Sequence, residues 1–357
     1  MASVEERVHI ALDNWAPRFI ANGVDANDVQ NLSRTISRWE DWSPSWSMLA
    51  AARVQMGEKA EAEGNFESAG EHYFQATMLY HFGKFMMVGH PDRLRAGHDN
   101  TVRTYQRGLA FYEFPGERVE IPYEQGRFIA AILRKPPHAR APLVILAPGL
   151  DSVKEELHRY GNDMLRRGMA ILAIDGPGQG ELEFDLPLRP DYEVPIRYVL
   201  DYLESRTDID AQRVGMLGVS LGGFFAARAA AAEQRLQAVV MLASGYNLER
   251  HFERYPLLTQ EAFIYRLKAT DEATAREKLR EFTLEGRTSS ITCPFLVIGG
   301  RRDRLFPPED AERVVREVGA NAELWMFDDG NHVCNNIPYK YRPQQADWLR
   351  NALRSSR

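Results

Sequence analysis

The chain has 357 residues, roughly twice the length of a common domain, so we expect either one large domain with an insertion or two domains packed together. Its composition, with 44% hydrophobic and 26% charged residues, is that of an ordinary globular protein and excludes disorder over most of the chain. The net charge is -6, of which residues 1–110 contribute 11 minus 14, or -3, so no region is basic enough to predict a nucleic-acid partner.

The first residues and the cysteines bear on where the protein works. Glu5 and Glu6 lie where a signal peptide needs positive charge, and no apolar run approaches the ~18 residues of a membrane span. The two cysteines, Cys293 and Cys334, are too few for a disulfide framework or a Cys-built metal site. We therefore expect a cytoplasmic protein without membrane contact.

Residues 1–115 form a predicted helical region. Apolar residues there recur at steps of three and four, which predicts one apolar stripe along a helix. The stripe consists of Phe66, Ala69, Tyr73, Ala76 and Tyr80. Four of the six tryptophans lie in the same region, and these are Trp15, Trp39, Trp42 and Trp46. We expect them to anchor helix packing, with a pocket for an aromatic substrate as the alternative.

Residues 116–357 form a predicted α/β domain. Two runs joined by a short turn, 118–123 and 128–133, predict an antiparallel hairpin. Later runs are apolar on successive residues, as strands buried on both faces of a parallel sheet must be. These runs are 142–148, 169–176, 213–219, 237–243, 294–300 and 322–328. The pattern predicts a mostly parallel sheet with helices on both faces and reactive loops at the carboxyl ends of the strands.

The stretch 246–290 interrupts this alternation. It contains two helical patterns, at 258–268 and 271–283, and is long enough to be an excursion from the sheet. We expect a helical excursion over the reactive edge of the sheet.

The strongest local signal is the sequence GVSLGG at 218–223, which follows an apolar strand and precedes an Ala-rich helix. Glycines on both sides of Ser220 allow a tight strand-to-helix turn that lifts the hydroxyl clear of the sheet. This placement predicts a nucleophilic serine, although a Gly-rich turn with an idle serine is the structural alternative.

A serine hydroxyl needs a base to take its proton and an acid to hold that base in the correct tautomer. Asp303 comes just after the strand at 294–300, and His332 comes just after the strand at 322–328. All three side chains would then project from carboxyl ends of one sheet, in the chain order Ser, Asp, His. Glu249 and Glu253 are the alternative acids, because they follow the strand at 237–243.

An oxyanion needs N–H donors that are aimed before charge develops. The backbone N–H of Leu221, at the start of the helix after Ser220, is one candidate. The second candidate is the N–H of Leu150, in the loop after the strand at 142–148, since Pro148 has no N–H.

The sequence DGPGQG at 175–180 invites a dinucleotide-binding interpretation, but its glycine spacing is wrong and Pro177 removes a donor that a phosphate needs. We predict instead a turn that seats neighbouring loops. No cluster of His and carboxylates has the spacing of a metal site. We therefore expect neither a cofactor nor a metal.

With these motifs in place, the chain resembles the α/β-hydrolases, and more narrowly the group of 2,6-dihydroxypseudooxynicotine hydrolases and fungal polyketide chain-shortening hydrolases. Four stretches support the resemblance: P-G-L-D-S-x-K-E-E at 148–156, D-G-P-G-Q-G-E at 175–181, G-x-S-L-G-G at 218–223, and G-x-H-x-C-x-N at 330–336. It extends over most of residues 110–350 and, more loosely, over the N-terminal helices.

The resemblance implies an α/β-hydrolase fold with an N-terminal helical cap, a substrate held between cap and sheet, and hydrolysis of a carbon–carbon bond beside a ketone. The triad carries over as Ser220, Asp303 and His332. The group's extra catalytic glutamate has no secure counterpart, because the spacing after Ser220 differs by a few residues, and Glu253 or Glu249 would fill it. The group also tends toward homodimers.

We therefore expect a serine hydrolase acting on a small-molecule carbonyl substrate of β-diketone or aryl ketone type. The alternative is a carboxylesterase or lactonase that uses the same triad. A third interpretation is a non-catalytic relative that uses its cap to bind a protein, which the complete Ser-Asp-His set argues against.

Overall fold

A computed structural model describes residues 4–137 and 140–355, which divide into two compact units. The helical unit contains the residues up to Glu117 together with Pro256–Ala262. The sheet unit contains Arg118–Tyr255 and the residues from Phe263 onward. The segment Pro256–Ala262 lies within the stretch for which the sequence predicts a helical excursion, and it is the one part of that stretch that groups with the N-terminal helices.

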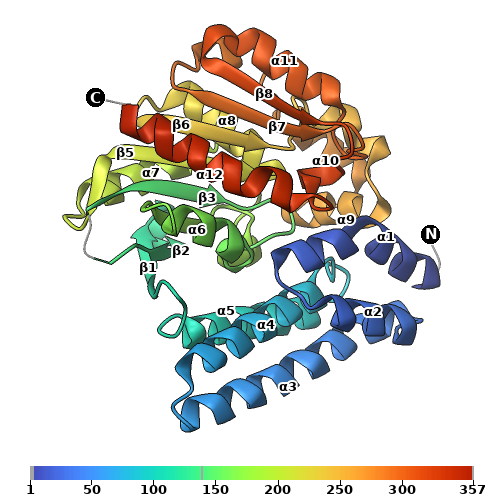
Figure 1. The fold of residues 1–357 in the computed structure, drawn as a ribbon. Helices are drawn as coiled ribbons and strands as arrows, with labels where there is room; N and C mark the ends of the chain where they lie inside the picture. Colours follow the sequence, from blue (N-terminus) through green and yellow to red (C-terminus); the bar gives the residue numbers. More distant parts are fainter. Residues whose placement is uncertain (1–3, 138–139, 356–357) are drawn as a thin grey trace. The chain divides into compact units, whose positions relative to one another are not determined.

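In the helical unit, α3 packs against α4 and α4 packs against α5, while α1 contacts α2 (Figure 1). Asp25 caps the N-terminus of α2 by accepting a hydrogen bond from the N–H of Asn27. The helices are α1 (Val4–Asn22), α2 (Ala26–Thr35), α3 (Trp42–Ala62), α4 (Phe66–Lys84) and α5 (Pro91–Gly108). The predicted helical region is confirmed.

The four tryptophans form the aromatic core of the helical unit. Each is 5% exposed or less. Trp15, Trp42 and Trp46 pack with phenylalanine rings at centroid distances of 5.1–6.3 Å, and Trp39 stacks on Trp42 at 5.3 Å. The phenylalanines are Phe19, Phe82 and Phe85. The indole Nε1 of Trp42 donates to the carbonyl oxygen of Phe82 at 3.0 Å. These side chains therefore anchor helix packing, as the first of the two interpretations of the tryptophans expects.

Helix α4 differs from the single stripe that its sequence predicts. Phe66, the first residue of the predicted stripe, is 51% exposed, although its ring stacks on Phe111. From Tyr73 onward almost every side chain of the helix is buried, including Thr77 and Lys84. The reason is that α3 and α5 pack against α4, so it has more than one buried face.

The sheet unit contains one eight-stranded sheet with the order β1-β2-β4-β3-β5-β6-β7-β8. Strand β2 runs antiparallel to β4, and the pairs from β4 to β8 are parallel. The strands are β1 (Gly116–Pro122), β2 (Phe128–Arg134), β3 (Ala141–Ala147), β4 (Ala170–Asp175), β5 (Ile209–Val219), β6 (Leu236–Leu242), β7 (Phe295–Gly300) and β8 (Ala322–Phe327). Every predicted strand is present, and the mostly parallel α/β sheet is confirmed.

Helices cover both faces of this sheet. Helices α6 and α12 pack together, with α12 on β5 and β6, whereas α7 and α8 pack together behind the same strands (Figure 1). Helix α11 packs on β7 and β8. These helices are α6 (His158–Leu165), α7 (Glu193–Glu204), α8 (Leu221–Ala232), α11 (Pro308–Val318) and α12 (Pro338–Ser355). Strands β4 and β7 are consequently buried along their whole length, while the edge strands β1 and β8 are partly exposed.

The two helices that the sequence predicts between β6 and β7 are present as α9 (Leu257–Arg266) and α10 (Glu272–Leu279), and the 3-10 helices η5 (Glu249–Arg254) and η6 (Thr288–Ser290) flank them. None of the helices in the two described ranges combines the length and the apolar character that a membrane span requires.

Candidate active site

Ser220 lies in a strained turn between β5 and α8. Its backbone has φ 57° and ψ -121°, in the region of positive φ that side chains other than glycine rarely adopt. The turn is held by the N–H of Ser220, which donates to the carbonyl of Leu242 at 2.8 Å, and by the N–H of Gly223, which donates to the carbonyl of Ser220 at 2.8 Å. This is the tight strand-to-helix turn that the glycine pattern predicts.

Close backbone packing around Ser220 leaves no room for a side chain at Gly218 or Gly222. A Cβ on Gly218 would lie 1.9 Å from the carbonyl oxygen of Gly222, and a Cβ on Gly222 would lie 2.3 Å from the carbonyl oxygen of Ala147. Both obstacles are backbone atoms, so no side-chain rotation could relieve the clash. The sequence thus brings β5, α8 and the end of β3 closer than any other residue type would allow.

Asp303, His332 and Ser220 form one chain of polar contacts. The Nδ1 of His332 lies 2.8 Å from Oδ2 of Asp303, and its Nε2 lies 2.9 Å from Oγ of Ser220. The other carboxylate oxygen of Asp303 accepts the N–H groups of Leu305 and Phe306 at 2.8 and 3.1 Å. Because its side chain is only 3% exposed and bound on both oxygens, the acid has a fixed orientation toward the imidazole.

The loops that carry the acid and the base are locked together by backbone contacts. A Cβ on Gly300, at the end of β7, would lie 2.3 Å from the carbonyl oxygen of Gly330, and the N–H of Arg302 donates to that same oxygen at 2.9 Å. Directly after the histidine, Val333 and Cys334 both have positive φ, 61° and 50°. A β-branched residue at such an angle is strained, which fits a loop whose shape is imposed by its surroundings.

One predicted oxyanion donor directly follows the serine, and the residue before the other donor lies against it. Leu221 is the first residue of α8 and directly follows Ser220. On the other side, a Cβ on Gly149 would lie 3.2 Å from Cβ of Ser220 and 3.7 Å from its Oγ, so the segment that leads into the buried Leu150 runs against the serine. That the N–H groups of Leu221 and Leu150 serve as oxyanion donors stays a prediction.

The turn at 175–180 seats the neighbouring loop, as predicted. Asp175 accepts the backbone N–H of Lys154 at 2.8 Å, and the amide of Gln179 donates to the carbonyl oxygens of Pro148 and Gly149 at 2.6 and 3.0 Å. Both side chains are fully buried. The side chains of Asp175 and Gln179 therefore hold the loop that contains Leu150 in place.

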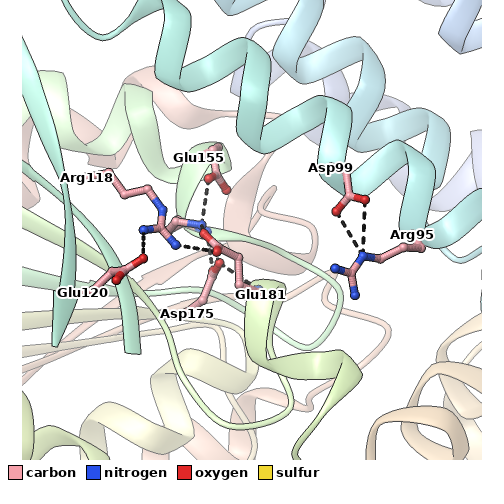
Figure 2. A network of polar contacts seen from close by, with 8 residues as sticks. Arg95, Asp99, Arg118, Glu120, Glu155, Asp175 and Glu181 are labelled. Atoms are coloured by element: carbon pink, nitrogen blue, oxygen red, sulfur yellow. Dashed lines mark hydrogen bonds and ion pairs between the residues drawn. The ribbon is translucent and has the colours of Figure 1, made fainter. Parts of the chain in front are cut away.

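A network of mostly buried charges surrounds Lys154, which follows the same loop (Figure 2). It was not predicted from the sequence. The ammonium of Lys154 lies 2.8 Å from a carboxylate oxygen of Asp175, of Glu155 and of Glu181, and Arg118 binds Glu181 at 2.7 Å. Burial alone would lower the pKa of Lys154, but the three carboxylates raise it. Burial raises the pKa of Glu155, although Lys154 opposes this shift. Consecutive charged residues look like a solvated loop in sequence, which is why the burial of this set could not be predicted.

Glu249 and Glu253, the candidates for an additional acid, both bind Arg276 of α10. Arg276 donates to Glu249 at 2.9 and 3.1 Å and to Glu253 at 2.7 Å. The side chain of Glu253 is 77% exposed, and that of Glu249 is 20% exposed. Each carboxylate is thus engaged as an acceptor by the guanidinium. Neither contact involves Ser220 or His332.

Known proteins are similar to this chain over most of its length. The FrsA-like esterase family matches residues 26–336. The 2,6-dihydropseudooxynicotine hydrolase of Paenarthrobacter nicotinovorans is 32% identical over 347 residues, which cover 95% of this chain and 92% of that protein. The α/β-hydrolase xenA of Xenoacremonium sinensis is 31% identical, with 87% of each chain covered. A crystal structure of the 2,6-dihydroxy-pseudo-oxynicotine hydrolase is similar with a TM-score of 0.88, 31% identity, and coverage of 95% of this chain and 96% of that chain.

Proposed function

Because the chain belongs to the FrsA-like esterase family of α/β-hydrolases, we propose that it is a serine hydrolase whose nucleophile is Ser220. The observation that supports this most is the chain of contacts from Ser220 through His332 to Asp303, at 2.9 and 2.8 Å. Strain at the serine backbone adds support, since such strain is typical of functional turns.

In the proposed reaction, His332 takes the proton of Ser220 at Nε2 while Oγ attacks a substrate carbonyl carbon. Asp303 accepts a hydrogen bond from the Nδ1–H group of His332 and stabilises the imidazolium that forms, without taking the proton itself. The π electrons of the carbonyl move to its oxygen, where the N–H groups of Leu221 and Leu150 would stabilise the negative charge. Collapse of this intermediate expels the leaving group and leaves an acyl group on Ser220, which water then releases as a carboxylic acid with His332 again as the base.

We propose that the bond hydrolysed is a carbon–carbon bond beside a ketone. Its leaving group departs as an enolate, which takes at carbon the proton that His332 received from Ser220. The similarity to a named hydrolase of a pseudooxynicotine over 95% of the chain supports this class, together with the four stretches of the resemblance. A small β-diketone or aryl ketone is the substrate type that fits this chemistry.

Ester hydrolysis is the second candidate, and two observations favour it. The matching family is described as an esterase family. In addition, Glu249 and Glu253, the groups that could have supplied an extra proton to a carbon leaving group, are bound by Arg276. An alkoxide leaving group needs only the proton that His332 returns.

A substrate panel separates the two candidates. Turnover of 1-phenyl-1,3-butanedione, para-nitrophenyl acetate and a δ-lactone would be measured for the wild type, with Ser220→Ala as the background. Carbon–carbon hydrolysis predicts kcat/KM for the diketone at or above that for the ester, with benzoic or acetic acid as product. Aryl ester turnover far above that of every diketone would refute the carbon–carbon proposal and leave the esterase.

Three expectations from the sequence stay predictions: the helical unit acts as a cap that selects the substrate, the protein forms a homodimer, and it is cytoplasmic. The first would be tested by random substitution of the helical unit and selection for altered substrate preference. Sedimentation velocity would measure the second, and fractionation of the source cells the third.

A further inference from the structure

The amide of Gln179 is buried, and each of its polar atoms is bound. Its Nε2 donates to the carbonyl oxygens of Pro148 and Gly149 at 2.6 and 3.0 Å, and its Oε1 accepts the hydroxyl of Tyr192 at 2.8 Å. A primary amide has two N–H donors, so both donors are used by two successive carbonyls of one loop. Such a fully bound buried amide has one orientation and holds its partners to one orientation.

The carbonyl of Gly149 and the N–H of Leu150 belong to the same peptide group. Because a peptide group is planar and trans, its C=O and N–H point in opposite directions, so a group that fixes the carbonyl also fixes the N–H. Gln179 binds the carbonyl end. The preceding Cα lies against the nucleophile, since a Cβ on Gly149 would stand 3.2 Å from Cβ of Ser220.

We propose that Gln179 is a positioning residue that aims the N–H of Leu150 at the oxyanion. This inference rests on the proposed function, because it assigns a role to a donor of the proposed oxyanion site. A hydrogen bond to the carbonyl also polarises the peptide group, which makes its N–H a stronger donor. Gln179 thus contributes both to the direction and to the strength of one oxyanion contact without touching the substrate.

The hydroxyl that holds Gln179 is tied to the helix of the nucleophile. The ring of Tyr192 stacks on Phe225 of α8 with centroids 3.9 Å apart and an interplanar angle of 7°. A Cβ at Gly176 would lie 2.1 Å from the Tyr192 hydroxyl oxygen, so only glycine leaves room for this contact. Helix α8 begins directly after Ser220. The contacts from α8 through Tyr192 and Gln179 therefore set the position of the Leu150 loop relative to the serine.

The test compares Gln179→Met with Gln345→Met. Methionine keeps the length and volume of glutamine but removes both donors, and Gln345 is an equally buried glutamine in α12 that has no part in the proposed site. We would measure kcat and KM for para-nitrophenyl acetate, together with Ki for an aryl trifluoromethyl ketone. Oγ of Ser220 adds to the carbonyl carbon of that ketone, and the oxyanion that forms accepts hydrogen bonds from the proposed N–H donors. Ki therefore reports on the strength of those donors.

The expected result for Gln179→Met is a fall in kcat of about 10- to 100-fold with KM within about 3-fold, and a rise in Ki by the same factor as the fall in kcat. Gln345→Met should leave all three values within about 2-fold. A Gln179→Met enzyme that keeps its kcat, or that loses kcat with Ki unchanged, overturns the proposal.

Tyr192→Phe decides the question if Gln179→Met does not fold. It removes only the hydroxyl that holds the Gln179 amide, and the proposal predicts a 3- to 10-fold loss that is equal in kcat and in Ki. Unchanged values in this variant would overturn the proposal. The proposed function fails separately: a wild type that no fluorophosphonate labels at Ser220 refutes the serine hydrolase itself, whereas a labelled wild type with a fully active Gln179→Met refutes only the role of Gln179.

Discussion

Substitution of Gly222 by alanine tests whether close backbone packing sets the distance between the nucleophile and the Leu150 loop. The new Cβ would lie 2.3 Å from the carbonyl oxygen of Ala147 and 2.6 Å from that of Pro148. Since non-bonded carbon and oxygen atoms stay about 3.4 Å apart, the backbone must move by roughly 1 Å. We expect a loss of about 1–3 kcal/mol in the free energy of unfolding from overpacking. We also expect a fall in kcat on the order of 100-fold, because 1 Å is enough to misalign a reacting group.

The assay is kcat/KM for para-nitrophenyl acetate, with thermal unfolding followed by circular dichroism at the same protein concentration. Gly299→Ala in β7 is the control, because its Cβ would meet the flexible end of Met326 at 3.0 and 3.4 Å and would make only an ordinary van der Waals contact, at 3.8 Å, with Cβ of Ala311. This control should keep its activity within about 3-fold. If Gly222→Ala also keeps kcat/KM within that range, the close backbone contact does not set the geometry of the site.

Three further predictions concern the surroundings of the site. Lys154→Met leaves Asp175 buried without its cation and should lower the free energy of unfolding in urea by about 3–5 kcal/mol. The control Lys340→Met, at the surface, should leave the urea midpoint almost unchanged. Equal shifts in the two variants would contradict a buried ion network. Burial would raise the pKa of Glu181, but Lys154 and Arg118 lower it below its ordinary 4.5. Glu181→Gln should therefore be less stable than the wild type at neutral pH, and the difference should shrink as the pH falls below 4.5 and be lost once the pH is below the lowered pKa of the folded state. A difference that stays constant with pH would argue against this linkage. Burial raises the pKa of Cys334 to about 12, so iodoacetamide should modify this thiol only after unfolding, and rapid modification of the folded protein, seen by mass spectrometry, would count against its burial.

The strands could be predicted from the sequence because a strand buried on both faces must be apolar on every residue. Strand β5 shows where this fails, since it begins at Ile209 and not at the predicted 213. Two of the four missed residues, Asp210 and Gln212, are polar; Asp210 forms an ion pair with Arg213, and the pairing with β3 shifts register between Pro142 and Leu143. Because polar residues interrupt the start of this strand and its register shifts there, it has no continuous apolar run by which it could be recognised.

The site was predictable for a similar reason, and only in part. Ser220, Asp303 and His332 each follow the end of a predicted parallel strand, and those ends share one edge of the sheet. The turn at 175–180 was predicted to seat a neighbouring loop, but the side-chain contacts of Gln179 and Lys154 were not predictable. Their partners lie about 20 to 30 residues away, and a polar residue in a loop looks the same in sequence whether it is buried or solvated.

Labelling with a fluorophosphonate tests the central claim most directly, since this reagent reacts only with a serine whose hydroxyl is activated by a base. Intact mass and peptide mapping would be recorded for the wild type and for Ser220→Ala, with His332→Ala to test the base. We expect one adduct on the wild type, located on Ser220, none on Ser220→Ala, and a reaction slowed by orders of magnitude in His332→Ala. A wild type without an adduct, or an adduct that persists in Ser220→Ala, would contradict the claim that Ser220 is the nucleophile.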